Sequence, residues 1–295
     1  MHFGKYLKPP DTSVFIYFIR TIVLVKRIRT DFLYYETAGE HLIMRDYKTD
    51  GIIIRVRDYH EADRIVTLFT RDCGKVQAIA KGCRRQKSRK RGLIQLFTYG
   101  HFALYKGRSL DTITQCEGKE SFGALREDLD RMAYGAYMAE LLDGFVNAGE
   151  PHEDLFYLTL VCFHLLTVED PELVTRAFET RTMGLLGYRP HLEDCVQCGQ
   201  RLEGPQVAFS SMLGGSLCGF CANCDPAAVA CNMGTLNMLK QLAEWDIRKL
   251  RVLRMNDETK REIGEILGTY IGHRLEKKIK SADFLKSLTS VQNIG

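Results

Sequence analysis

The sequence predicts a multidomain α+β protein in which a small β-barrel is followed by a mainly helical domain. Three observations carry this prediction. Five short strand-like segments fall between residues 46 and 120, apolar residues at helical spacing follow from residue 121, and six of the ten cysteines crowd into residues 195–231. A chain of 295 residues is long enough for two domains of the usual size, about 100 to 200 residues each.

The first part of the chain, residues 1–45, mixes an apolar run with charges in no clear period, and we interpret it as an extension. Met44 stands directly before the first strand signal, so one hypothesis is that translation begins there. Peptides from residues 1–43 in the mass spectrum of the natural protein would refute it.

The most apolar stretch, residues 14–25, is interrupted by Arg20. It is shorter than the roughly 20 apolar residues of a membrane-spanning helix. Cationic residues follow it where a secretory signal would have a small-residue cleavage site. These features, with cysteines in a metal-binding and not a disulfide pattern, predict a cytoplasmic protein.

The barrel is expected between residues 46 and 120 because β-branched and aromatic residues there form short runs separated by turn residues. Five such runs in about 70 residues are typical of a small barrel. The expected strands are residues 51–56, 65–70, 75–80, 102–105 and 112–114.

The period changes after Ser121, where apolar residues recur at helical spacing from Leu125 to Phe145. The predicted domain spans residues 121–290 and has an insertion at about 191–231 that contains the cysteines. Its further helices are expected at 153–168, at 171–186, where proline suits a first turn, and with breaks at 235–288.

A dense basic run lies between the third and fourth expected strands. Residues 81–91 include seven cations and no acidic residue, and these are Lys81, Arg84, Arg85, Lys87, Arg89, Lys90 and Arg91. Such a run predicts a polyphosphate partner, because counterions released on binding supply a large favourable free energy. A solvated loop is the alternative. With no recognition-helix pattern, binding is expected to be indifferent to base order.

Four aromatic residues follow this run, and they can be interpreted in two ways. Phe97, Tyr99, Phe102 and Tyr105 could stack on unpaired bases, as aromatics do in proteins that bind single strands. The interpretation as barrel core is favoured, since aromatics in strands are usually buried.

The cysteine cluster has the spacing of a zinc site. Cys195 and Cys198 form one CxxC pair, and 19 residues separate it from the pair of Cys218 and Cys221. Four thiolates satisfy tetrahedral Zn²⁺ and leave no open position, so the predicted metal is structural, one per chain. Gly199, Gly214 and Gly215 are expected to provide the positive-φ backbone of the turns.

The register of the second pair stays open, because Cys221 and Cys224 also form a CxxC pair. His191 and Cys231 are less favoured substitutes. A redox role is disfavoured, because the βαβ pattern that accompanies redox CxxC motifs is absent from the sequence. Cys73, Cys83, Cys116 and Cys162 fit the interpretation of small buried side chains.

Motifs of the common enzyme classes are missing. The sequence has no phosphate-binding P-loop, no HExxH metalloprotease motif and no nucleophile elbow. We therefore predict that the protein is not an enzyme, and we expect no catalytic residues.

From residue 47 to residue 288 the sequence resembles the RecO family of recombination mediators. Several segments carry the resemblance in this order: residues 49–54, 61–66, 80–85, 185–190 running into Cys195 and Cys198, 214–215 before Cys218, and 280–285. The first 46 residues and Cys224 depart from the family pattern.

The resemblance implies an N-terminal OB fold and a helical domain with an embedded zinc knuckle. It further implies a protein of the RecF pathway of recombinational DNA repair, associated with the nucleoid. Such a protein binds single- and double-stranded DNA, anneals strands, contacts single-stranded DNA-binding protein, and helps RecR to load RecA. Within the matched motif lie Lys81, Arg84 and Arg85. Two rival hypotheses are a zinc-ribbon transcription or RNA-binding module and a nucleic-acid hydrolase.

Overall fold

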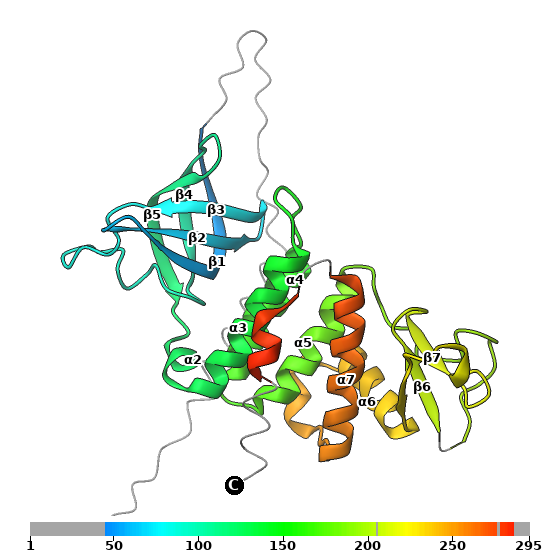
Figure 1. Cartoon of the computed structure of the whole chain (residues 1–295). Coiled ribbons are helices and arrows are strands. Elements are labelled where there is room, and N and C mark those ends of the chain that lie inside the picture. The colour runs from blue at the N-terminus through cyan, green and yellow to red at the C-terminus, as the bar shows by residue number, and fades with distance from the viewer. Residues whose placement is uncertain (1–44, 205, 276–277, 286–295) are drawn as a thin grey trace, which may run out of the picture. The chain divides into compact units, whose positions relative to one another are not determined.

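The computed structural model describes residues 45–204, 206–275 and 278–285. A β-barrel comes first in this part of the chain, and helices with a small sheet between them follow (Figure 1). Residues 1–44, which include nearly all of the expected extension and the alternative start at Met44, lie outside the described residues. No helix in the described ranges is long and apolar enough to cross a bilayer.

The barrel is closed and has the strand order β1-β2-β3-β5-β4. Only β3 and β5 pair in parallel, and every other pair of neighbours is antiparallel. This is the OB-like barrel that the sequence predicts. Its strands are β1 (Asp46–Tyr59), β2 (Asp63–Thr70), β3 (Gly74–Ala80), β4 (Tyr99–Tyr105) and β5 (Asp111–Glu120).

Strand β1 closes the barrel because it pairs with two neighbours in succession. Its first half pairs with β4 as far as Ile52, and the part from Gly51 onward pairs with β2. A bulge between Ile53 and Arg55 lies near the change of partner and bends the strand, as bulges do. Beyond Ile52, β1 therefore forms a hairpin with β2 alone.

The barrel interior is filled by apolar side chains from all five strands and from the connection between β3 and β4. Burying them removes apolar surface from water, which is the main stabilising contribution to such a core. The core residues are Ile53, Val66, Leu68, Ala78, Ala80, Cys83, Ile94, Phe102, Leu104 and Ile113.

Each expected strand lies within an observed one, but β1 and β5 are longer than predicted. Both ends of β1 expose charged side chains such as Lys48 and Arg57, so apolar alternation does not mark them. Backbone pairing with β4 at one end and with β2 at the other nevertheless keeps both ends of β1 in the sheet.

The helices follow the predicted order. They are α2 (Gly123–Glu127), α3 (Leu129–Phe145), α4 (Glu153–Leu166), α5 (Pro171–Leu185), α6 (Met233–Glu244) and α7 (Asp257–Arg274), with a 3₁₀ turn, η2 (Ile247–Val252), between α6 and α7. Residues 280–285 are also helical.

Capping side chains explain where several helices begin. Asp170 accepts from the amides of Glu172 and Leu173, one residue before the proline that opens α5. Asn232 and Asn256 cap α6 and α7 in the same way. The single helix expected from Leu125 to Phe145 is wrong at Asp128, whose extended backbone separates α2 from α3 and whose carboxylate accepts from the amide of Arg131 at 3.0 Å.

A charged network is buried between α3 and α5. Glu179 is fully buried and accepts hydrogen bonds from Tyr137 and, at 2.8 Å, from the guanidinium of Arg176. Burial alone would lower the pKa of Arg176, but the carboxylate of Glu179 outweighs burial. The pKa of Arg176 is therefore raised above its usual value. Arg176 also pairs with Glu172 at 3.8 Å, so removing Glu179 would leave it this longer ion pair, whereas removing Arg176 would leave the buried carboxylate of Glu179 without a cation.

The segment between α5 and α6 forms a three-stranded sheet of order β7-β6-β8, which the sequence did not predict. Its strands are β6 (Val207–Ser210), β7 (Gly215–Leu217) and β8 (Val229–Cys231), and a 3₁₀ turn, η1 (Ala222–Cys224), lies between β7 and β8. Phe209 packs edge-on against Tyr270 of α7, at 5.4 Å between ring centroids. The sheet is thus fixed to the helices.

Candidate nucleic-acid surface and metal centre

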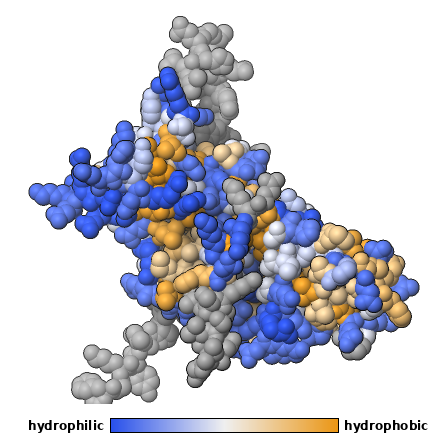
Figure 2. All heavy atoms as spheres, viewed as in Figure 1, coloured by the Kyte–Doolittle hydropathy of each residue, from blue (hydrophilic) through white to orange (hydrophobic). Residues whose placement is uncertain are grey.

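The basic run begins directly after β3, in the connection that leads to β4. All seven cations except the half-buried Lys90 are exposed. Figure 2 shows a largely hydrophilic surface over the barrel in this view. The connection from residue 81 to residue 98, here called the basic loop, consists of turns without a helix or strand.

Few of these charges are neutralised within the described part of the chain. The guanidinium of Arg84 pairs with Asp58 at 3.4 Å, and the ammonium of Lys90 donates to the carbonyl of Ile113 at 2.9 Å. Among the described residues no ion pair involves the other five cations. The loop therefore presents a positive surface to solvent.

The start of the basic loop is fixed to the turn between β1 and β2. Asp63 accepts from the amide of Gly82 at 2.7 Å, and the amide of Arg84 donates to the carbonyl of Ala62 at 2.9 Å. Between them Cys83 is buried in the barrel core. Gly82 has φ +66°, which a residue with a Cβ rarely adopts.

The end of the basic loop is fixed equally firmly. Ile94 is fully buried and its carbonyl accepts from Arg64 at 2.9 Å, while Arg126 donates to the carbonyl of Leu96 at 2.9 Å. Phe97 is also buried and its amide donates to Ile53. The cations thus project from a backbone that is held at both ends.

The aromatic residues after the loop do not form a stacking surface. Phe97 packs against Phe163 at 5.2 Å, and Phe102 belongs to the barrel core, so the stacking interpretation is wrong for both. Tyr99 lies against Phe156 and under the ammonium of Lys119. Tyr105 is 38% exposed and accepts from Arg45 at 3.0 Å.

The sequence reasoning missed a different aromatic pair, Tyr59 and His60, at the turn between β1 and β2. Both are exposed and their ring centroids are 4.0 Å apart. The polar residues on either side of the pair are typical of an ordinary turn, so the local pattern offers no reason to single out Tyr59 and His60. Their position at the end of a strand is the one signal that could have found them.

Four cysteine sulfurs come together beside the small sheet. The Sγ atoms of Cys195, Cys198, Cys218 and Cys221 all lie within 4.8 Å of one another, and those of Cys198 and Cys218 are 3.8 Å apart. Zn–S bonds of about 2.3 Å in a tetrahedron place sulfurs about 3.8 Å apart. The donor set and its spacing therefore fit a zinc ion.

Glycine allows this arrangement in two ways. Gly199 and Gly214 have φ of +69° and +75°, as predicted. Gly215 is not in that region, contrary to the prediction. It lies in β7 and packs so closely on His191 that a Cβ would stand 2.7 Å from the carbonyl oxygen of that residue.

The thiols of the cluster act on one another's ionisation, in opposite directions at Cys195 and Cys221. Burial opposes ionisation of Cys195, but amide N–H groups of Cys218, Cys198 and Gln197 lower its pKa to about 6. A hydrogen bond with Cys198 raises the pKa of Cys221. Four thiolates together need a metal dication to offset their mutual repulsion.

The alternative ligands lie outside this four-sulfur group. Cys224 is exposed at the end of η1, and Cys231 is buried in β8. The imidazole of His191 is hydrogen-bonded to Asp194 at 2.6 Å. The structure thus groups the cysteines in the register Cys218 with Cys221.

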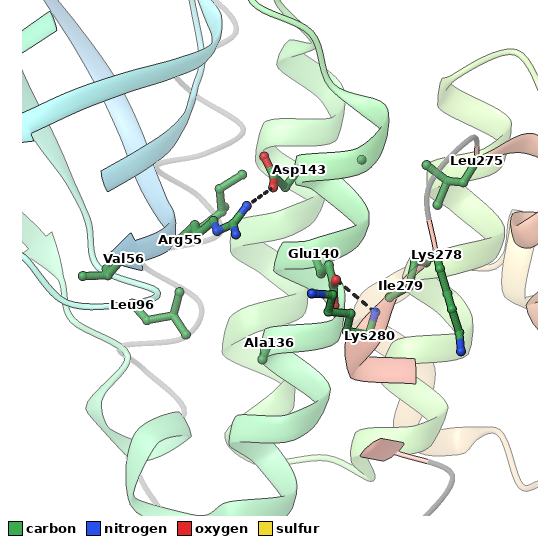
Figure 3. A pocket seen from close by; sticks show the side chains of 12 residues that line it. Arg55, Val56, Leu96, Ala136, Glu140, Asp143, Leu275, Lys278, Ile279 and Lys280 are labelled. Atoms are coloured by element: carbon green, nitrogen blue, oxygen red, sulfur yellow. Dashed lines mark hydrogen bonds and ion pairs between the residues drawn. The ribbon is translucent and has the colours of Figure 1, made fainter. Parts of the chain in front are cut away.

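A cavity of about 420 Å³ lies between β1, α3, Leu275 and residues 278–280 (Figure 3). Its two carboxylates already have partners. Asp143 pairs with Arg55 and with Lys75, both at 3.3 Å, and Glu140 accepts from the amides of Lys280 and Ser281. These carboxylates of α3 therefore connect the helix to the barrel and to residues 280 and 281.

Comparison with known proteins identifies the family. The model described as "Recombination protein O N terminal" matches residues 44–122, and "Recombination protein O C terminal" matches residues 126–283. Proteins called "DNA repair protein RecO" are similar over most of their length. That of Pelotomaculum thermopropionicum is 45% identical over 242 residues, which cover 82% of this chain and 94% of the relative.

Two further relatives extend the comparison. The protein of Desulforamulus reducens is 40% identical over 252 residues, 85% of this chain and 98% of its own. That of Symbiobacterium thermophilum is 42% identical over 250 residues, 83% of this chain and 99% of its own. An OB-like barrel with a basic loop, a helical domain and a four-cysteine cluster agree with these matches, and the chain belongs to the RecO family of DNA repair proteins.

Proposed function

We propose that this protein is a nonenzymatic mediator of recombinational DNA repair, which binds and anneals single-stranded DNA in the cytoplasm, at the nucleoid. It acts with RecR and single-stranded DNA-binding protein to load RecA. Family membership and the names of the relatives support this role.

The observation that carries the proposal is the basic loop. Six exposed cations project from a backbone fixed at both ends, and only Arg84 has a carboxylate partner among the described residues. DNA phosphates would neutralise these charges and release counterions, which favours binding in proportion to the number of phosphates contacted. The residues proposed to bind DNA are Lys81, Arg84, Arg85, Lys87, Arg89, Lys90 and Arg91.

Annealing follows from the same electrostatics. Two complementary strands repel each other through their phosphates. On a shared cationic surface this repulsion is reduced, so the strands can approach and test base pairing. Lys90 and Arg84 contribute charge but also hold the loop, through Ile113 and Asp58.

The four-cysteine cluster is proposed to hold one structural zinc ion through Cys195, Cys198, Cys218 and Cys221. Its role is to keep the segment between α5 and α6 folded. Elemental analysis of the purified protein should find about one zinc per chain. Full-length protein that is stable without metal would overturn this role.

The loop is tested by replacing Arg85, Lys87, Arg89 and Arg91 with alanine, since none of the four has an ion pair within the described ranges. A matched control removes four exposed cations elsewhere that likewise have no ion pair within the described ranges, at Arg201, Lys249, Arg251 and Arg261. Affinity for a single strand is measured over a salt series for wild type and both variants. The loop variant should lower the salt slope by about 3, at about 0.7 per phosphate contact.

The control separates a specific site from overall charge. If both variants weaken binding equally, or neither does, the loop is not the DNA site. Annealing assays with and without single-stranded DNA-binding protein then test the mediator role. Preferential capture of RNA or of RNA polymerase would instead support a transcription or RNA-binding module, and metal-dependent strand cleavage would contradict a nonenzymatic role.

A further inference from the structure

The turn between β1 and β2 presents two aromatic rings to solvent. Tyr59 ends β1 with 38% of its surface exposed, and His60 follows it with φ +49°. Their rings meet edge to face, at an interplanar angle of 60°. An exposed ring of this kind can stack on the flat face of a ligand ring.

Other exposed tyrosines of the described chain have polar or aromatic neighbours that account for them. Tyr105 accepts a hydrogen bond from Arg45, and Tyr188 faces Phe145 and the guanidinium of Arg274. For Tyr59 the ring contact within the described residues is with His60 alone. The exposed 38% of Tyr59 is the surface on which we expect a ligand ring to stack.

The aromatic pair is fastened to the basic loop by direct bonds. Arg84 donates to the carbonyl of His60 at 3.2 Å, and its guanidinium pairs with Asp58, the residue before Tyr59. The amide of Arg84 binds Ala62. The rings and the cations are consequently parts of one surface.

A further cation extends this surface along β1. Arg57 stands two residues before Tyr59, so both side chains leave the same face of the strand, about 6.6 Å apart along it. Among the described strands this half of β1 pairs with β2 alone, and on its other side the backbone of Ile53 is bonded to Phe97 and Thr98 of the basic loop. Of the three neighbouring carboxylates, Asp58 and Asp63 are occupied by Arg64, Arg84 and Gly82, and Glu61 is exposed.

We propose that Tyr59 and His60 form a stacking platform for an unpaired base of a DNA strand whose phosphates lie on the basic loop and Arg57. The inference rests on the proposed function and goes beyond it, because it names the feature that distinguishes single strands from duplex. In a duplex the base faces are covered by neighbouring pairs, so the platform adds affinity only for unpaired bases. The cations act on both kinds of DNA.

The test compares three ligands of equal length: a thymine strand, a strand of the same phosphate number with abasic sites in its central part, and a duplex. Wild type should bind the thymine strand more tightly than the abasic one by about 5- to 150-fold, the range of one base–aromatic stack. Tyr59→Ala should lose that preference and keep its salt slope and its duplex affinity. Tyr59→Phe should behave as wild type.

A spectroscopic readout confirms contact with the base. The chain has one tryptophan, Trp245, far along the sequence in the helical domain. A Tyr59→Trp, Trp245→Phe protein places the only indole at the platform, and its fluorescence should be quenched by the thymine strand but not by the abasic one. Equal quenching by both would overturn the proposal.

The outcomes also separate this inference from the proposed function. If the loop variant loses affinity for all three ligands while Tyr59→Ala keeps its preference for the thymine strand, the platform is refuted and the DNA site stands. If the loop variant binds all three as wild type does, the DNA site itself is refuted, and the platform with it.

Discussion

Gly135 determines how closely the basic loop can be anchored to helix α3. It is buried in the middle of the helix, and a Cβ added there would stand 3.0 Å from Cζ and 3.3 Å from Cε1 of the Phe97 ring. That ring cannot easily move, because it packs on Phe163 and its backbone is bonded to Ile53. Gly135→Ala therefore forces a clash at the end of the basic loop.

The expected magnitude combines two opposing effects. Alanine favours a helix over glycine by about 1 kcal/mol, whereas overpacking a core costs about 1 to 3 kcal/mol. We expect a net loss of roughly 1 kcal/mol, or about 1.5 to 2 °C in Tm for a chain of this size. Urea unfolding followed by circular dichroism measures it.

Gly268 provides the control. It is exposed within α7, and a Cβ there would meet nothing within 4 Å. Gly268→Ala should therefore stabilise the protein, by about 0.5 to 1 kcal/mol. In a Phe97→Leu background the ring that meets the new Cβ is absent, so Gly135→Ala should lower the free energy of unfolding by less. If Gly135→Ala stabilises the protein as Gly268→Ala does, the close packing of Phe97 on α3 is wrong.

Three further predictions concern the metal site and two carboxylates. Cys198→Ser should lower zinc content well below one per chain and expose residues 190–231 to protease, as elemental analysis and limited proteolysis would show, whereas Cys224→Ser should change neither. Glu179→Gln should lower the free energy of unfolding by about 2 kcal/mol, because it removes the shorter of the two ion pairs of the buried Arg176 and leaves the longer one to Glu172, and an unchanged urea midpoint would contradict this. Burial opposes ionisation of Asp50, but hydrogen bonds from Lys119 and His101 outweigh it and lower its pKa. The stabilisation is thus complete above the unfolded-state pKa of about 3.9 and is lost as pH falls through the lower folded value, so Asp50→Asn should flatten the acid side of a stability–pH curve.

Local patterns in the sequence were sufficient for much of the fold. The strands, the helix starts at Glu153 and Pro171, and the CxxC spacing each depend on residues close together in the chain. The sulfur cluster could be predicted because each CxxC pair already turns its two thiols toward one point. These signals need no knowledge of the packing.

Other features depend on contacts between distant residues, which a single sequence does not reveal. Phe97 and Tyr59 are both aromatic, Phe97 two residues before β4 and Tyr59 at the end of β1. Phe97 is buried against α3, where Gly135 leaves room for its ring. Tyr59 is exposed at the end of β1, in the part of the strand that no longer pairs with β4. The short strands of the knuckle were missed because three or four residues have no period to detect.

The fixed ends of the basic loop bear on how DNA would bind and leave. A disordered cationic tail loses conformational entropy when it wraps around a strand, and that loss is subtracted from its affinity. A loop that is already ordered loses little, so each contact contributes nearly its full free energy. Because most of that free energy comes from displaced ions, a modest rise in local salt or a competing polyanion would suffice to release the strand, as a protein that hands DNA to another must do.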